Sequence, residues 1–458
     1  MTALDRVFSL TARGTTVRAE VLGGATTFAT MAYIVIVNPA ILAFAGIPAG
    51  PSTVATILAA VFGTGLMALY ANRPIAVAPY MGENAFVAFG LAAAGVVWPQ
   101  LLGIVFLSGL AFLALTLLGV RAWLADAISP SLKHSFAAGI GLFLALIGLY
   151  ETGIVTSAAA GQPAAALTGP GGLLRAPAVP LRIGDLHDPR VLLAVAGVLG
   201  IAVLMQRRVP GALLLGIAAT AIAGGLLGKG EWPRAVAALP FRGDYDLSPL
   251  FLKLDVAGAL RAPLFPALLT LFIMGFLDTL GTLVGVGAAG RLLDEKGDFP
   301  EIEKPMLVDA VSCVFAGLVG TTTSGAYIES ATGIREGART GLASLVTAAL
   351  FALSLFFVPL LEPLQKLSYA YAPALVAVGI LMTGSFARMD FDDLTELVPA
   401  FLTVALMVFT YNIANGLTAG LLVHPLLKTA AGRAREVKAG GWALALLCAA
   451  YYVFGLPH

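Results

Sequence analysis

Two interrupted stretches of sequence decide the fold of this chain. The first covers residues 74–86 and reads PIAVAPYMGENAF. The second covers residues 318–330 and reads LVGTTTSGAYIES. Each begins with a short strand-like segment next to Pro or Gly, and each continues into a short apolar helix. We therefore expect two broken half-helices, each preceded by a short strand.

The two stretches occupy corresponding positions, because each introduces the third apolar window of its half of the chain. Paired interruptions of this kind are typical of transporters built from inverted repeats, in which the broken helices form the substrate site. Non-helical backbone inside a membrane is tolerated only where protein buries it or a cavity hydrates it. Both interruptions should therefore line one cavity.

The overall composition is that of a membrane protein. Of the 458 residues, 59% are hydrophobic and 12% are charged, whereas soluble domains carry about 25% charge. These values exclude a soluble or a disordered chain. The net charge of +1 offers no basic surface for nucleic acid. The two cysteines have no spacing that indicates a disulfide framework or a metal site.

Apolar windows predict an all-α polytopic protein with about 14 transmembrane helices, seven in each half. The first seven windows lie at about 21–45, 52–70, 83–95, 98–119, 136–154, 190–205 and 211–228. The second seven lie at about 264–287, 306–318, 325–337, 340–361, 371–385, 395–411 and 416–428. A further run near 441–455 is short for a span.

This count divides the chain into three parts. We predict a first inverted repeat over residues 1–228, an extracytoplasmic connecting segment over 229–262 and a second repeat over 263–458. An odd number of helices in each repeat makes the repeats insert in opposite orientations. Lys and Arg gather in the short loops that face the cytoplasm when the N-terminus is cytoplasmic. The first apolar run lacks a cleavage site and is expected to be a retained helix.

Four acids lie deep in apolar sequence, and no basic residue accompanies them at that depth: Glu83, Asp278, Asp309 and Glu329. Charges at such positions are costly and usually functional. Glu329 is expected in the first turn of the second half-helix, where the helix dipole favours the carboxylate and desolvation favours the acid. Such opposed effects suit a proton-coupled group. Glu329 could instead be a helix N-cap or make a structural hydrogen bond to the opposite strand. Asp309, close to Lys304, is more typical of a helix cap or a salt bridge.

Two other polar residues accompany these acids. Thr282 follows Asp278 by one helical turn on the same face, so Asp278 could bind substrate or hold a hydroxyl or backbone donor. Asn84 opens the first half-helix beside Glu83, where an amide can both donate and accept hydrogen bonds. Asn84 could instead be a simple cap, and Glu83 could face away from the cavity.

Motifs of enzymes and of nucleotide-binding proteins are not supported. The GxGxxG match at residues 285–290 ends an apolar helix, whereas a dinucleotide site needs a preceding strand. There is no P-loop, no cluster of His ligands and no GxSxG nucleophile motif with a placed His and Asp. We therefore expect no enzyme activity, no cofactor and no metal.

Four runs of residues, in order along the chain, resemble a known family. They are TTFATMAYI at 26–34 with VNP at 37–39, APYMGENAF at 78–86, FLDTLGT at 276–282 and YIESATG at 327–333. These runs are similar to the AzgA-like adenine/guanine/hypoxanthine permeases of the nucleobase-ascorbate transporter (NCS2) superfamily, and the likeness covers essentially the whole chain. The sequence departs from the common family pattern at Glu83, where many members have an apolar residue, and at Tyr80, where many have Gly.

The resemblance implies a 7+7 inverted repeat with core and gate domains, a homodimer, and proton symport by an elevator-like movement. It also implies a multi-pass protein of the plasma membrane, here a bacterial inner membrane. The binding positions of the family fall on Gly82, Asn84, Asp278 and Glu329. These are among the residues that the depth of the charges and the interruptions had already indicated.

A purine suits these side chains. Guanine and hypoxanthine present N–H donors that a carboxylate accepts, whereas adenine needs a protonated carboxyl or an amide such as Asn84. A planar base also favours aromatic walls, and Phe28, Tyr80, Phe86 and Phe276 lie near the motifs. Each of these aromatic residues could equally be part of the core.

The leading interpretation is therefore a proton-coupled importer of purine nucleobases, with Glu329 and Asp278 as the proton-coupling residues. A uracil or xanthine permease of the same fold is the first alternative. An anion carrier is disfavoured because the deep charges are acidic. A membrane-embedded enzyme would need two acids that share a proton, and no companion motif supports one. A non-transporting receptor would not explain the paired interruptions.

Overall fold

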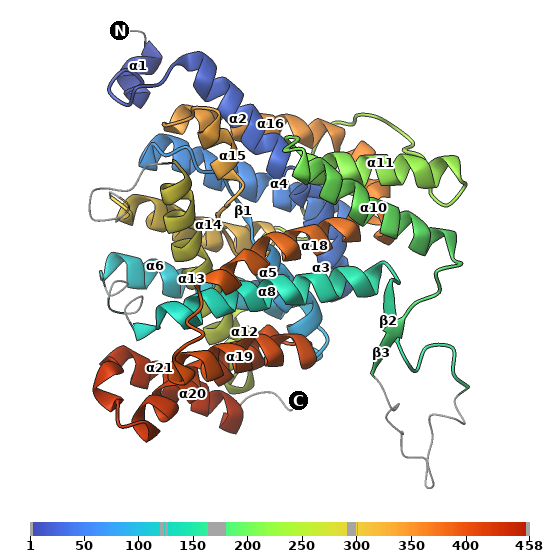
Figure 1. The fold of residues 1–458 in the computed structure, drawn as a ribbon. Coiled ribbons are helices and arrows are strands. Elements are labelled where there is room, and N and C mark those ends of the chain that lie inside the picture. Colours follow the sequence, from blue (N-terminus) through green and yellow to red (C-terminus); the bar gives the residue numbers. More distant parts are fainter. Residues whose placement is uncertain are drawn as a thin grey trace.

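The computed structural model describes residues 3–119, 123, 127–163, 180–290, 299 and 301–454. Most of the described chain is helical, and the helices lie side by side in one body (Figure 1). Eight helical segments of the described chain are long and apolar enough to cross a membrane. Some of the remaining apolar helices are shorter than a standard span, so the predicted count of 14 stays a prediction.

The first half of the chain contains helices of very different lengths and three short strands. In chain order its elements are α1 (Ala3–Phe8), α2 (Val17–Met31), α3 (Ile34–Leu42), α4 (Ala49–Leu66), β1 (Val77–Pro79), α5 (Met81–Ala85), α6 (Trp98–Leu117), α8 (Pro130–Glu151), β2 (Val155–Ser157), β3 (Leu181–Ile183), α10 (Pro189–Gln206) and α11 (Ala212–Leu226). Two π-helical turns extend α4 and α5, at Met67–Ala71 and Phe86–Leu91.

The second half repeats the sequence of long helix, strand and short helix. Its elements are α12 (Val256–Ala259), α13 (Phe265–Gly290), α14 (Glu303–Val319), β4 (Ser324–Ala326), α15 (Ser330–Arg335), α16 (Gly341–Ser354), α17 (Val358–Gln365), α18 (Ser368–Met382), α19 (Leu394–Phe409), α20 (Ile413–Ala430) and α21 (Ala439–Phe454). Short 3-10 turns lie at Ala43–Ala45, Gly243–Tyr245, Ala262–Leu264, Leu355–Phe357, Thr383–Arg388 and Ala434–Glu436.

Packing divides the helices into two groups. In the first group, α2 packs on α15 and α16, α4 packs on α3, α14 and α16, and α6 packs on α13 and α14. In the second group, α8 packs on α18 and α19, α10 packs on α11 and α18, and α20 packs on α19 and α21. Both strand–half-helix units belong to the first group, and α5 and α13 also contact α8 of the second group.

The strand-like segments seen in the sequence are β1 and β4. They form a two-stranded antiparallel sheet in the middle of the molecule, with Ala78 opposite Gly325 (Figure 1). All six strand residues are buried. Gly325 has to be glycine here, because a Cβ atom at this position would lie 2.1 Å from the hydroxyl oxygen of Tyr80. The two half-helices, α5 and α15, therefore start from one shared sheet.

Three features of the fold were not predicted from local sequence patterns. The first apolar window bends after α2, at Ala32 and Tyr33, before α3 begins. The polar stretch at 229–262 contains the short helix α12, which packs on α6. In the segment after α8, β2 pairs with β3, with Thr156 opposite Arg182. Three-residue strands separated by more than 20 residues leave no periodic signal in the sequence.

Candidate functional site

The sheet between the two half-helices is held by side chains from neighbouring helices. Thr64 of α4 both donates to the carbonyl of Val77 and accepts from its N–H, each at 2.9 Å. Ser330, the first residue of α15, accepts from the N–H of Ala76 at 3.0 Å. These bonds satisfy backbone groups that a two-stranded sheet leaves open, as buried membrane backbone requires. The half-helix positions are therefore well defined.

A chain of amide and hydroxyl groups positions Asn84. Its Nδ2 donates to Oδ1 of Asn38 at 2.7 Å, and Asn38 Nδ2 donates to the hydroxyls of Thr56 and Thr321 at 2.7 and 3.0 Å. Asn84 is not a helix cap, since α5 has Tyr80 at its N-cap position. The buried Oδ1 of Asn84 has no hydrogen-bond partner in the described structure. It is an acceptor that a ligand could use.

Glu329 lies at the N-cap position of α15, one residue before the helix begins. The hydroxyl of Tyr33, in the bend between α2 and α3, donates to Glu329 Oε1 at 3.0 Å. The side chain is half-buried, so one carboxylate oxygen is held by Tyr33 while the residue keeps access to its surroundings. This arrangement can present an acceptor to a ligand and can also exchange a proton.

Asp278 lies midway along α13 and is also half-buried. Within the described chain its carboxylate makes no hydrogen bond and no ion pair, so the predicted alternative of holding a hydroxyl donor is not what this conformation contains. Thr282, one turn further on, is nearly buried. Asp278 is therefore a second accessible acceptor near the half-helices.

Asp309 is neither a cap nor the partner of Lys304, and this part of the sequence prediction is wrong. Lys304 instead pairs with Glu301 at 2.7 Å. Asp309 is fully buried on α14, and its Oδ2 accepts from the N–H of Ala326 at 2.9 Å and from the hydroxyl of Thr279 at 3.0 Å. The Asp309 carboxylate, on α14, therefore links β4 to α13.

Tyr80 belongs to the same hub. Its hydroxyl lies 2.8 Å from that of Thr279 and donates to Asp309 Oδ2 at 3.4 Å. The ring stacks near Tyr327, with ring centroids 6.4 Å apart. In this conformation the Tyr80 hydroxyl is used to hold α13 and α14 together, so Tyr80 positions the half-helices.

The remaining predicted site residues have different surroundings. Gly82 faces α8 of the second group, and a Cβ atom there would lie 2.8 Å from Cγ2 of Ile140. Glu83 is fully buried, and neither carboxylate oxygen has a hydrogen-bond partner in the described structure. Phe86 is also buried, whereas Phe28 is half-buried and contacts Phe351 edge-on at a centroid distance of 5.0 Å.

Several polar residues of this region were not selected from the sequence. Tyr33 and Asn38 lie inside the first quoted run, and a polar residue within an otherwise apolar window was the available signal. Glu20 is fully buried and accepts from the N–H groups of Arg339 and Ala343, at 2.7 and 3.1 Å, around the start of α16. Its position near a charged terminus gave no indication of burial.

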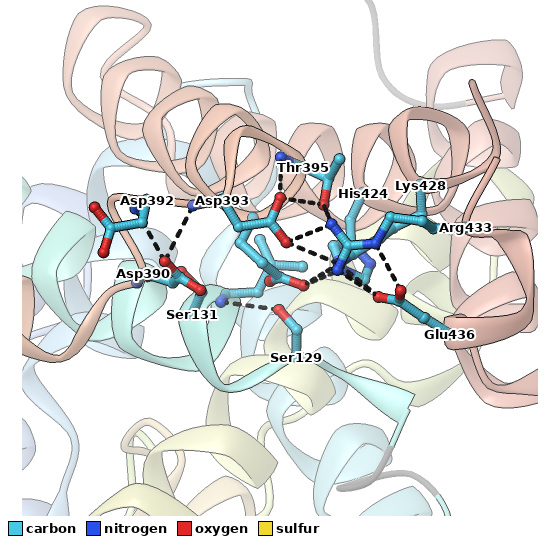
Figure 2. A network of polar contacts seen from close by, with 12 residues as sticks. Ser129, Ser131, Asp390, Asp392, Asp393, Thr395, His424, Lys428, Arg433 and Glu436 are labelled. Carbon is cyan, nitrogen blue, oxygen red and sulfur yellow. Dashed lines mark hydrogen bonds and ion pairs between the residues drawn. The ribbon is translucent and has the colours of Figure 1, made fainter. Parts of the chain in front are cut away.

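A second polar cluster, the α19–α20 ion network, lies far along the chain from the half-helices. It consists of Asp393, Glu396, His424, Lys428, Arg433 and Glu436 (Figure 2). Lys428, nearly buried, lies 3.0 Å from Glu396 and from Glu436. Hydrogen bonds from Thr395 and Arg433 hold the pKa of the Asp393 carboxyl well below its usual range. Those from Arg433 and Lys428 lower the pKa of Glu436.

Comparisons with known proteins were made on sequence and on structure. The sequence model of the permease family matches residues 18–418. The chain is 40% identical to a putative permease of Methanocaldococcus jannaschii, over 99% of both chains. It is 37% identical to the adenine permease AdeP of Escherichia coli, over 99% of this chain and 97% of the relative. It is 36% identical to the guanine/hypoxanthine permease PbuO of Bacillus subtilis, over 94% and 96%.

Among solved structures, the fold is similar to that of the transmembrane domain of a cyanobacterial bicarbonate transporter, BicA. The TM-score is 0.57 at 19% identity, and the match covers 88% of this chain and 97% of that domain. SLC26A9 matches with a TM-score of 0.60 at 13% identity, over 90% of this chain and 65% of that one. At these identities the similarity concerns the fold alone.

Proposed function

We propose, from the premise that this chain belongs to the permease family, that it carries purine nucleobases across a membrane together with protons. The predicted membership in the nucleobase-ascorbate transporter superfamily is confirmed, and the chain is a multi-pass membrane protein. Relatives that cover nearly the whole chain are named as permeases of adenine and of guanine and hypoxanthine. The choice of a purine as substrate then rests on the chemistry of the site.

The observation that carries the proposal is the set of acceptors around the two half-helices. Asn84 Oδ1 has no partner, and Asp278 and Glu329 are half-buried acids with free acceptor capacity. A purine base carries its N–H donors in one plane at its edges, and acceptors in a low-dielectric site bind such donors strongly. We assign Asn84, Asp278 and Glu329 to these donors, and we propose Gly82, two residues before Asn84 on the first half-helix, as part of the same site.

Proton coupling is assigned to Glu329, with Asp278 as the second candidate. Its neighbour Tyr33 donates a hydrogen bond, which favours the carboxylate, while burial in an apolar group of helices favours the acid. Binding of a base that donates N–H groups adds to the first effect. A carboxyl with such balanced preferences can load a proton on one side of the membrane and release it on the other.

The transport movement is assigned to the two packing groups. The half-helices and their sheet belong entirely to the first group, whereas Ile140 opposite Gly82 belongs to the second. A sliding of the first group, the core, against the second, the gate, would carry the site across the membrane as in an elevator. The 7+7 repeat, the homodimer, the cytoplasmic N-terminus and the bacterial inner membrane are proposed with it.

The test is uptake of radiolabelled hypoxanthine into cells that lack their own purine permeases. We expect accumulation that a protonophore abolishes and that excess adenine or guanine inhibits. Uracil and xanthine serve as competitors for the alternative within the same superfamily. Well-expressed protein that accumulates none of these bases would refute the proposed function and leave the fold assignment intact.

A further inference from the structure

Glu83 is a buried acid for which the transport scheme above has no role. Both of its oxygens are buried and have no hydrogen-bond partner in the described structure. Its carboxyl group lies against α13, because a Cβ atom at Gly275 would be 3.9 Å from Glu83 Oε1 and would meet no other atom within 4 Å. Asp278 follows Gly275 by less than one helical turn, so the two acids face the same part of α13.

The groups that act electrostatically on Glu83 leave it without a counter-ion. Asp278 is the charged neighbour on α13, and the other titratable groups around it are Cys313 on α14 and the phenols of Tyr80 and Tyr327. Among the described residues, no Lys, Arg or His acts on it. The one group that favours the charged form of Glu83 is its own backbone N–H. An ionised carboxylate without a base in this setting is very costly, and two adjacent carboxylates resist ionising together. Asp278 is also acted on by Glu329 and itself acts on Asp309, so every charged group that acts on the pair among the described residues is an acid. The pair therefore holds a proton in this conformation.

The two acids differ in access. Asp278 is half-buried and can exchange a proton with water or with a bound base, whereas Glu83 is sealed from solvent in this conformation. A proton that enters through Asp278 can be kept at Glu83. In that step the O–H bond on Asp278 breaks as the O–H bond on Glu83 forms, and the negative charge moves to Asp278.

We propose, resting on the proposed proton-coupled transport, that Glu83 and Asp278 together bind a second proton that travels with the base. Asp278 is the entry point and Glu83 is the store, and this proton is additional to the one on Glu329. Because protonation of the pair belongs to both residues, removal of either acid removes the site.

The experiment measures how steeply accumulation depends on the pH gradient. Purified protein in liposomes is given labelled hypoxanthine or adenine, with the membrane potential held at zero by potassium and valinomycin. The slope of log accumulation against the pH difference equals the number of protons per base. We expect a slope of about two for the wild-type protein and of about one for Glu83→Gln. Glutamine keeps the shape of the neutral acid but cannot release a proton.

Two further variants make the result specific. Glu83→Asp keeps an acid and should retain the wild-type slope. Glu20→Gln is the matched control, because Glu20 is another fully buried acid whose oxygens accept backbone N–H groups. It should lower the yield of folded protein and leave the slope unchanged. Uptake is normalised to folded protein in every case.

The outcomes separate this inference from the proposed function. An unchanged slope in Glu83→Gln would overturn the second proton site, and so would an Asp variant with the slope of the Gln variant. A wild-type protein that accumulates the base with a slope of one would also overturn it, while leaving proton-coupled transport in place. A wild-type protein that accumulates no purine would refute both.

Discussion

Acidic side chains meet opposite surroundings in two regions of this molecule. Around the half-helices, Glu83, Asp278, Asp309 and Glu329 have hydroxyls, backbone N–H groups or no partner at all. In the α19–α20 ion network, each acid lies next to Lys428, Arg433 or His424 (Figure 2). A carboxylate beside a base stays ionised, whereas an acid without a base can change its charge when a proton or a ligand arrives. The first region is suited to coupling, and the second to holding helices together.

The contrast between the two regions predicts its largest effect for a substitution of Glu329. Glu329→Gln keeps an acceptor for Tyr33 but cannot exchange a proton, so we expect coupled accumulation of purine to fall by about 100-fold. Labelled uptake with and without a protonophore measures this. Glu436→Gln in the ion network is the control and should accumulate the base normally. Accumulation by Glu329→Gln that keeps its full pH dependence would move the proton site elsewhere.

Asp309 tests whether every deep acid is a coupling residue. Asp309→Ala leaves the N–H of Ala326 and the hydroxyl of Thr279 without an acceptor, at a cost of about 3 kcal/mol in the free energy of unfolding. Thermal unfolding in detergent measures the loss, and uptake should decline with the amount of folded protein. Asp309→Asn keeps an acceptor oxygen and should lose less. Full stability with uncoupled transport in the alanine variant would make Asp309 a coupling residue instead.

Lys428 tests the other region. Lys428→Met removes the nearly buried base that three acids share, and we expect unfolding to become easier by about 2 kcal/mol. The partners are partly exposed, which reduces the effect below that of a fully buried pair. Arg435→Gln, on an exposed neighbouring turn, is the control and should have no effect. Uptake per folded molecule should stay normal, and a selective loss of transport would contradict the structural role.

The smallest expected effect concerns pH. Hydrogen bonds from Thr395 and Arg433 depress the pKa of Asp393 in the folded state, so this acid stabilises the fold above its unfolded pKa of about 4. That contribution is lost as pH falls toward the folded pKa. The difference in melting temperature between the wild type and Asp393→Asn should therefore be constant at neutral pH and vanish in strong acid. A difference that changes between about pH 6 and pH 8 would show another group at work.

Short stretches of sequence predict much of the region around the half-helices. The run around Val77 and Pro79 predicts a strand that ends at once in a half-helix, because each proline keeps the residue before it extended and has no backbone N–H to donate. Asp278 and Glu329 stood out because any charge within a long apolar run is costly. The role of Asp309 was misjudged, since its partner Ala326 follows it by 17 residues and a nearer lysine offered a simpler explanation.

The sequence by itself therefore determined the membrane environment, the two interruptions and which acids stand within apolar runs, since hydropathy and helix breaking are properties of neighbouring residues. The tertiary structure alone decided which partner each acid has. Tyr33 reaches Glu329 across 296 positions, and Glu20 reaches Arg339 across 319. Such pairs depend on how distant helices pack. Helix packing therefore decides which acids are paired with a base and which can change their charge, and the composition does not reveal this.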